Sequence, residues 1–339
     1  MLAARYLARE KIEPVEVPIP VLGEDEALIK VEACGFCGSD LSIVAGQHPR
    51  AREPLTLGHE FCGTISEIRS SHSVFERGEL VTAIPLISCG QCYVCRNGMP
   101  HVCRTLKVYG FDFDGAMAEY VRLPVSSLLK LPAGMPNTVG AVIEPLAVAV
   151  HGVSLAAVDA AATAVVMGAG PIGLLTALVA KSRGVPSVLI SDVLPSRLSL
   201  AQELGLRAVP AGRELRETVK QETSGDGADL VFECAGVAST GKAMTELVRS
   251  RGTIINLGVF KKPVEIDMQA VNFKEIVIRG SRVYTRRDFE AAIHLADILP
   301  VGRIVTHSFA LRDVQAAFDC FRKGADVCKV LIVSNGNGR

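Results

Sequence analysis

The sequence has no excess of charge of either sign, because 36 basic side chains balance 36 acidic ones. A chain without a net positive field does not attract a nucleic-acid backbone or an anionic membrane surface. We therefore expect a small-molecule partner, and neither nucleic acid nor a membrane. The sequence also lacks internal repeats and an N-terminal signal peptide. Its ten cysteines thus indicate a reducing, cytoplasmic environment in which the thiols outside metal sites stay free.

Charged side chains are also absent from residues 160–180, a stretch long enough to suggest a membrane-spanning helix. The segment GAGPIG interrupts this stretch with three glycines and a proline, which divide it into a strand and a helix. We interpret it as the core of a soluble domain. A chain of 339 residues exceeds the roughly 250–300 at which one hydrophobic core stops growing. Two domains are therefore expected.

Two sequence patterns divide the chain. The first 145 residues contain short alternating segments such as ALIKVEACG and FCGTISEI, which predict β-rich structure. From about Pro145 onward, short apolar runs alternate with segments long enough for helices, which predicts a βαβ series and a parallel sheet. The runs are TAVVMGAG, SVLISD, DLVFECAG, TIINLG and IVIRGS. We expect all five strands to be buried, because helices cover both faces of such a sheet.

Four cysteines lie close together in the stretch CGQCYVCRNGMPHVC, at positions Cys89, Cys92, Cys95 and Cys103. This spacing lets four thiolates from one loop surround a single metal ion. Four sulfur ligands with no open position favour a structural zinc ion, so a catalytic metal would be bound elsewhere. An iron–sulfur cluster is the alternative, although the seven residues before Cys103 differ from the ferredoxin spacing.

The segment Gly168-Ala169-Gly170-Pro171-Ile172-Gly173 follows a predicted strand and opens a predicted helix, as a dinucleotide-binding turn does. Gly168 permits the turn, Gly170 leaves room for the pyrophosphate, and Gly173 lets strand and helix pack closely. The next strand ends at Asp192, 19 residues after Gly173, where a carboxylate can accept hydrogen bonds from both ribose hydroxyls. Because this carboxylate would repel a 2′-phosphate, we predict NAD as the cofactor. An ordinary turn or cap residue is the alternative interpretation of Asp192.

A second group of potential metal ligands lies in ACGFCGSD and LGHEFCG, which contain Cys37, His59 and Glu60. A thiolate, an imidazole and a carboxylate together could form a zinc site with an exchangeable position. Each fragment is ambiguous on its own, because a single cysteine or histidine more often belongs to the core than to a metal site.

The segments CGFCGSD, GHEFCG, the four clustered cysteines, EPLAVAVH, GAGPIG and Asp192 follow one another in a characteristic order. In this order they resemble the zinc-containing medium-chain dehydrogenase/reductase family across nearly the whole chain. Glu60 and Glu144 make the sequence most similar to the sorbitol and threonine dehydrogenase branch. The resemblance implies an α/β protein with an active site in the cleft between two domains.

The domains implied by the resemblance are a GroES-like, β-rich catalytic domain and a Rossmann domain with a doubly wound parallel sheet that binds NAD. We expect the catalytic domain at residues 1–145, with a structural zinc lobe at 89–103. The Rossmann domain would occupy residues 146–285, and residues 286–339 would return to the catalytic domain. A homodimer or homotetramer is also implied, joined at the sheet edge near INLGVF and IVIRGS.

Residue roles follow from the same resemblance. Cys37, His59 and Glu60 would bind the catalytic zinc, which gives two zinc ions per chain with the structural site. Glu144 would either complete the coordination or hold the zinc-bound water. Ser39 would take the proton from the substrate hydroxyl.

Three further sets of roles are implied. Asp40 would orient His59, since carboxylates commonly bond metal-ligating imidazoles. Arg197 would help to hold the adenosine ribose. The nicotinamide end would be lined by Leu257, Gly258 and Val259.

The reaction implied is the oxidation of a secondary alcohol (a polyol, sugar acid or sugar phosphate) to a ketone. Sorbitol-type sequences have a histidine and a polar aromatic residue where this chain has Ser42 and Ile43, which disfavours polyol recognition. A carboxylate or phosphate could instead be bound by guanidinium groups of the segment GSRVYTRR, with solvated surface arginines as the alternative. The candidates for substrate contact are Arg282, Tyr284, Arg286, Arg287 and His48. A non-catalytic NAD- or metal-sensing protein on the same fold is the alternative function.

Overall fold

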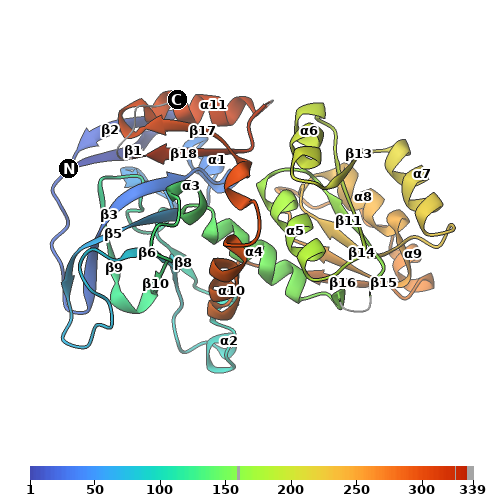
Figure 1. Cartoon of the computed structure of the whole chain (residues 1–339), viewed down its shortest axis with the longest axis horizontal. Coiled ribbons are helices and arrows are strands. Elements are labelled where there is room, and N and C mark those ends of the chain that lie inside the picture. The colour runs from blue at the N-terminus through green and yellow to red at the C-terminus, as the bar shows by residue number, and fades with distance from the viewer. Residues whose placement is uncertain (159–160, 325, 334–339) are drawn as a thin grey trace. The chain divides into compact units, whose positions relative to one another are not determined.

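The computed structural model describes residues 1–158, 161–324 and 326–333 (Figure 1). The chain forms two compact units, one made of Met1–Glu144 with Thr285–Arg339 and the other of Pro145–Tyr284. The chain passes from one unit to the other after Glu144 and after Tyr284, in each case one residue before the predicted domain boundaries at 145 and 285. Within the described ranges, no helix is both long enough and apolar enough to span a bilayer.

The first unit is mainly β-structure. One of its sheets has the strand order β10-β6-β5-β3-β18-β17, with β9 also paired to β3, and a second sheet has the order β2-β1-β4. The strands are β1 (Leu2–Ala8), β2 (Lys11–Glu16), β3 (Glu26–Gly35), β4 (Leu55–Thr56), β5 (Glu60–Arg69), β6 (Leu80–Ala83), β7 (Leu86–Ile87), β8 (Lys107–Val108), β9 (Tyr120–Pro124), β10 (Leu128–Lys130), β17 (Val305–Ala310) and β18 (Lys329–Val333).

Helices of this unit connect and cover its strands. They are α1 (Gly38–Val44), α2 (Tyr93–Arg96), α3 (Asn137–Gly140), α10 (Arg286–Ala296) and α11 (Val314–Lys323). Helix α4 (Ile143–Ser154) begins in this unit and continues into the second. The last strand, β18, pairs antiparallel with β3, so that Leu331 lies opposite Gly35. This pairing brings the C-terminal part of the chain to the residues that follow β3.

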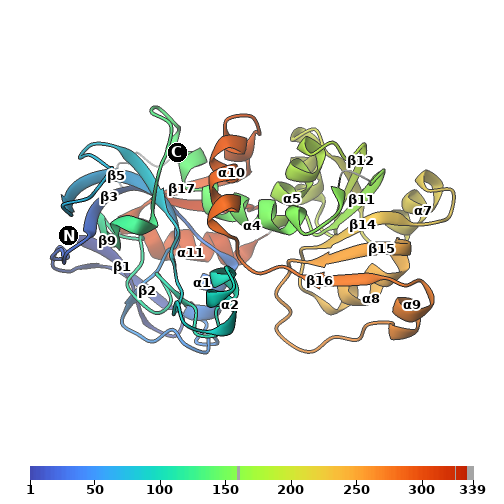
Figure 2. The same ribbon diagram turned by 90° about the horizontal axis from the view of Figure 1, so that it is seen from below.

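The second unit is a doubly wound parallel sheet with the strand order β13-β12-β11-β14-β15-β16. Its strands are β11 (Thr163–Met167), β12 (Ser187–Asp192), β13 (Arg207–Pro210), β14 (Ala228–Glu233), β15 (Val248–Asn256) and β16 (Val277–Gly280). Its helices are α5 (Pro171–Ser182), α6 (Pro195–Glu203), α7 (Arg213–Glu222), α8 (Ala238–Leu247) and α9 (Met268–Phe273). Helices α5 and α8 cover opposite faces of the sheet (Figure 2), as right-handed crossovers in opposite directions require.

The uncharged stretch that could have suggested a membrane helix divides into β11 and α5, as predicted. The prediction that all five apolar runs are buried strands is wrong for β16. This strand lies at the edge of the sheet beyond β15, and all four of its residues are exposed, Val277 by 48% and Ile278 by 37% (Figure 2). Because β16 is the last strand of the sheet, no described strand pairs with its outer edge.

Candidate metal and cofactor sites

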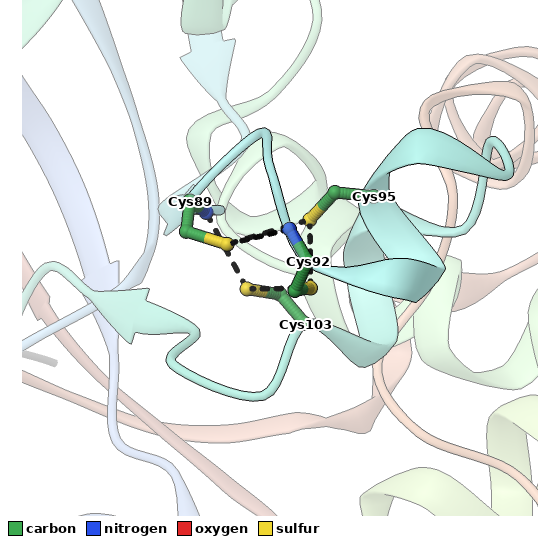
Figure 3. Close-up of side chains that lie close together, drawn as sticks. All are labelled: Cys89, Cys92, Cys95 and Cys103. Atoms are coloured by element: carbon green, nitrogen blue, oxygen red, sulfur yellow. Dashed lines mark hydrogen bonds between the residues drawn. The ribbon is translucent and has the colours of Figure 1, made fainter.

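The four-cysteine loop lies between β7 and β8, and its four sulfur atoms point toward one another (Figure 3). The Sγ–Sγ distances are 3.4 Å for Cys92–Cys95, 3.9 Å for Cys92–Cys103 and 4.0 Å for Cys89–Cys95. Four thiolates about 2.3 Å from a zinc ion would lie about 3.8 Å apart in a tetrahedron. A disulfide needs sulfur atoms about 2.05 Å apart, so these distances exclude disulfides between the named pairs.

Main-chain amides favour the ionised form of two of these sulfurs. The pKa of Cys89 is lowered to about 6 by the backbone N–H groups of Gln91 and Cys92. Backbone N–H groups also lower the pKa of Cys92, whereas burial and the neighbouring sulfurs raise that of Cys95 to about 11. Because the thiolate is the form that binds metal, a loop that stabilises thiolates before any ion enters is suited to zinc.

The second ligand group comes from two adjacent strands of the first unit. Strands β3 and β5 pair antiparallel, with Gly35 opposite Glu60. Cys37 follows β3 and caps α1, while Glu60 is the first residue of β5 and His59 immediately precedes it. Ligand atoms of Cys37, His59 and Glu60 all lie within 4.8 Å of one another. One sulfur, one nitrogen and one oxygen donor in this arrangement could hold a zinc ion.

The charges around His59 are those expected of a cation site. Burial opposes a charge on the His59 imidazole, but Cys37, Glu144 and Asp40 raise its pKa to about 10. Burial raises the pKa of Asp40 to about 6, although His59 and the backbone N–H of Cys37 oppose this shift. An imidazole whose pKa is raised this far has an excess of negatively charged groups around it. A divalent cation bound there would satisfy the same groups.

Lys329 belongs to this site, and our reading of the sequence missed it. Its ammonium group donates to Glu60 Oε2 at 2.5 Å and to the main-chain oxygen of Phe36 at 2.9 Å. Both side chains of the ion pair are almost completely buried, at 3% and 2% exposure. Glu60 is therefore fixed by a cation on one side while it faces Cys37 and His59 on the other. The available signal was a lysine at the start of the apolar strand KVLIV.

Three atoms at this site are buried and have no hydrogen-bond partner among the described residues: Ser39 Oγ, Asp40 Oδ1 and His59 Nδ1. The predicted contact of Asp40 with His59 is not a hydrogen bond in this structure. Instead, Asp40 Oδ2 accepts the N–H of Cys37 at 2.8 Å and caps α1. Polar atoms left unsatisfied in a buried site are available to a metal or substrate.

Residues predicted to contact substrate have varied surroundings. Tyr284 is buried. The exposed Arg286 side chain pairs with Glu290 at 3.1 Å and donates to the main-chain oxygens of Ser126 (3.0 Å) and Leu128 (3.4 Å). Arg282 and Arg287 are exposed. His48 lies on the ring of Phe111, with ring centroids 5.0 Å apart, and the same phenyl ring meets His59 edge-on at 4.9 Å. His48 is thus connected to the metal-ligand cluster through Phe111.

The glycine-rich turn of the second unit has the predicted local geometry. Gly168 has a φ of +102°, and a Cβ at Gly173 would lie only 1.7 Å from the Gly168 oxygen. At Gly170 a Cβ would meet nothing within 4 Å, so this position opens to free space. Pro171 and Ile172 form the first turn of α5, whose N-terminal amides can meet phosphate oxygens.

Asp192 ends β12 beside this turn and is buried. Its carboxylate accepts the N–H of Ala169 at 2.8 Å and of Leu194 at 3.0 Å, and lies 3.4 Å from the guanidinium of Arg197. Asp192 therefore joins the glycine-rich turn to the start of α6. The remaining predicted residues, Leu257 (buried), Gly258 and Val259 (83% exposed), follow β15 at the same carboxyl edge of the sheet.

Comparison with known proteins identifies the family. Residues 23–133 match the family model described as alcohol dehydrogenase GroES-like domain, and residues 171–297 match that described as zinc-binding dehydrogenase. The chain is 35% identical over 339 residues, 99% of each chain, to a 2-dehydro-3-deoxy-L-galactonate 5-dehydrogenase of Pseudoalteromonas atlantica. It is 34% identical over 319 residues, 91% of each chain, to an L-threonine 3-dehydrogenase of Bacillus licheniformis.

A solved structure agrees with these matches. A zinc-binding dehydrogenase from Sinorhizobium meliloti, bound to NADP, superposes with a TM-score of 0.88 at 35% identity and covers 98% of each chain. These comparisons give no support to a non-catalytic sensor. The chain belongs to the zinc-containing medium-chain dehydrogenase/reductase family, in its sorbitol and threonine dehydrogenase-like branch, and is an oxidoreductase of secondary alcohols that depends on zinc and a nicotinamide cofactor.

Proposed function

We propose that this dehydrogenase oxidises a secondary hydroxyl group of a sugar acid and uses NAD as the hydride acceptor. The observation that carries the proposal is the convergence of Cys37, His59 and Glu60 beside the unpartnered Ser39 hydroxyl. The sugar-acid substrate is supported by the name of the Pseudoalteromonas relative, which matches 99% of the chain. Polyols and sugar phosphates are the other substrates to be distinguished by experiment.

In this proposal Cys37, His59 and Glu60 hold the catalytic zinc. Zinc bound there acts as a Lewis acid that makes a substrate hydroxyl lose its proton more easily. Ser39 Oγ accepts that proton while its own hydroxyl proton passes on toward solvent, and no described residue bonds this hydroxyl. Lys329 holds one oxygen of Glu60 in place. Glu144, which lies close enough to raise the pKa of His59, binds the zinc directly or through water.

The four-cysteine loop holds the second zinc in this proposal. Its sulfur positions suit a tetrahedral ion, and its four ligands leave no position open for a substrate. We assign it a structural role, which is to keep the connection between β7 and β8 in one shape. The geometry alone does not favour an iron–sulfur cluster over the zinc that the family name implies.

A screen of candidate alcohols tests the substrate and the cofactor together. Purified protein with NAD should produce NADH absorbance with one or more aldonic acids that carry a secondary hydroxyl group. The same panel should include sorbitol, threonine and a sugar phosphate, each with NAD and with NADP. Turnover of threonine or sorbitol alone would contradict the sugar-acid assignment, and turnover with NADP alone would contradict the cofactor assignment.

The choice of NAD depends on Asp192. We infer that its buried carboxylate, which is bonded to the glycine-rich turn, binds the ribose of the dinucleotide, where its charge would repel a 2′-phosphate. We expect Asp192→Ala to weaken NAD binding and to shift the NAD/NADP preference in kcat/KM toward NADP by roughly tenfold. Arg197, 3.4 Å away, is then released from its carboxylate partner and could pair with the phosphate.

Asp192→Asn provides the matched control for this prediction. The amide keeps an oxygen that can accept the N–H of Ala169, so the glycine-rich turn should retain its shape. Preference should shift toward NADP as in the alanine variant, with a smaller loss of NAD affinity. Unaltered cofactor preference in both variants would remove Asp192 from the discrimination.

We also propose that two copies associate through β16, whose outer edge is unpaired and exposed among the described residues. An exposed strand with apolar side chains readily pairs with another strand, and a twofold axis would join two copies into one continuous sheet. Light scattering during size exclusion should give twice the mass of one chain, or four times if dimers pair further. A monomer would contradict this assignment.

A further inference from the structure

A buried carboxylate outside the predicted sites lies at the carboxyl end of β14. Glu233 is 0% exposed, and its neighbours in the sheet are Met167 at the end of β11 and Asn256 at the end of β15. The sheet grows from β11 in one direction through β12 and β13, and from β14 in the other through β15 and β16. In such sheets the ligand binds outside the carboxyl ends, at the point where the direction changes. Glu233 lies at that point.

Glu233 joins the turns that follow β14 and β15. Its side-chain Oε1 accepts three hydrogen bonds, from the N–H groups of Ala235 (3.0 Å) and Gly236 (2.8 Å) and the hydroxyl of Thr240 (2.7 Å). Its main-chain oxygen accepts the N–H groups of Leu257 (2.8 Å) and Gly258 (2.9 Å). One residue therefore fixes both turns, including residues that we predict to line the nicotinamide end.

The two turns meet so closely that only glycine fits at their contact. A Cβ at Gly258 would lie 2.3 Å from Glu233 Oε2 and 2.5 Å from the Gly236 nitrogen. A Cβ at Gly236, whose φ is +65°, would lie 2.8 Å from the Val259 oxygen. Ala235 also borders the glycine-rich turn, because a Cβ at Gly168 would lie 3.0 Å from its side chain. Glu233 thus lies where the turns after β11, β14 and β15 meet.

The second oxygen of the Glu233 carboxylate has no partner among the described residues. Three donors on Oε1 suit an acceptor-only carboxylate. Its second oxygen, Oε2, is buried without a hydrogen-bond partner, and no described lysine, arginine or histidine forms an ion pair with it. Water is excluded from this oxygen, so its field is poorly screened.

We propose that Glu233 is a positioning residue for the nicotinamide half of the cofactor and that its negative charge makes the protein bind the oxidised cofactor in preference to the reduced one. The oxidised nicotinamide ring carries a positive charge, which the reduced ring has lost, so a nearby negative charge stabilises only the oxidised form. Two unit charges about 10 Å apart, at an effective dielectric constant of about 20, change a binding constant by roughly tenfold. This inference rests on the proposed function only in taking a nicotinamide dinucleotide as the ligand.

The test is to measure dissociation constants for NAD+ and NADH, without alcohol, for the full chain and for Glu233→Gln. The glutamine oxygen can still accept the three hydrogen bonds made to Oε1, and the main-chain oxygen still binds the turn after β15, but the charge is gone. NAD+ should bind about tenfold more weakly, whereas NADH should change much less, so the ratio of the two constants shifts. A change of equal size for both cofactors, or no change, would overturn the charge effect.

Glu233→Asp provides a second test if the glutamine variant does not fold. Aspartate keeps the charge but is too short to accept the hydrogen bonds of the turn after β14, so both cofactors should bind more weakly and their ratio should stay near that of the unaltered protein. A ratio that shifts as strongly as predicted for glutamine would overturn the proposal.

Asp229→Asn is the matched control, because Asp229 lies on the same strand at its opposite end and is paired with Arg249 at 2.6 Å. The Asp229→Asn substitution also removes one negative charge, but the ratio of the NAD+ and NADH dissociation constants should not change. Because no alcohol or turnover is involved, a failed substrate screen leaves this test intact. If NADP is the preferred cofactor, the same dissociation constants are measured with NADP+ and NADPH in place of NAD+ and NADH. If the unaltered protein binds no dinucleotide, both proposals fall.

Discussion

Replacing Glu144 by alanine should lower kcat roughly a hundredfold while the dissociation constant for NAD changes little. Residues that support a catalytic metal typically cost 10–100-fold in activity or metal affinity when removed. Glu144 is buried in the first turn of α4 and raises the pKa of His59, which places it beside the proposed ligands. Steady-state turnover gives kcat, and calorimetry gives the dissociation constant for NAD.

His151→Ala is the control for this prediction, because His151 is buried on the same helix seven residues later. Seven residues span about 10 Å, too far for both side chains to reach one zinc ion. The His151 variant should lose stability through packing, seen as a lower melting temperature, and keep most of its turnover. An inactive His151 variant together with an active Glu144 variant would reverse the assignment.

The second large effect is expected from Cys95→Ser. Loss of one thiolate should empty the four-cysteine loop, so that metal analysis finds one zinc ion per chain in place of two. Metal binding at a closed site contributes to folding free energy, and a loss of about 3 kcal/mol lowers the melting temperature by roughly 4 °C in a chain of this size. Turnover measured well below the melting temperature should change far less than stability does.

Cys320→Ser is the matched control, since Cys320 is a partly buried free thiol outside both ligand groups. Its replacement should leave two zinc ions bound and change the melting temperature by much less. Equal melting temperatures for the Cys95 and Cys320 variants would argue against metal in the four-cysteine loop. Iron in place of zinc in the metal analysis would favour the iron–sulfur alternative.

The sequence was sufficient to predict features whose partners are close in the chain. Four cysteines within residues 89–103 can hold only a local metal site, because their separation limits where the sulfurs can go. The turn from Gly168 to Gly173 is equally local, since its glycines are required by contacts within the turn itself. The family resemblance supplied the assignment of Cys37, His59 and Glu60 to one site, which the pairing of β3 with β5 then makes possible.

Tertiary structure alone decided which charges meet and which apolar strand remains uncovered. Lys329 binds Glu60 across 269 residues of sequence because β18 pairs with β3, and neither residue's neighbours indicate the other. Glu233 is an acid at the end of an apolar run, but its role depends on the turns after β14 and β15. The segment IVIRGS has the same apolar pattern as the buried strands. The strand that it forms, β16, is nevertheless exposed because it is the last strand of the sheet. A hydrophobic pattern in the sequence predicts that a strand is buried, but the actual neighbours of the strand depend on its place in the sheet. That place is determined by long-range packing, which the local sequence does not contain.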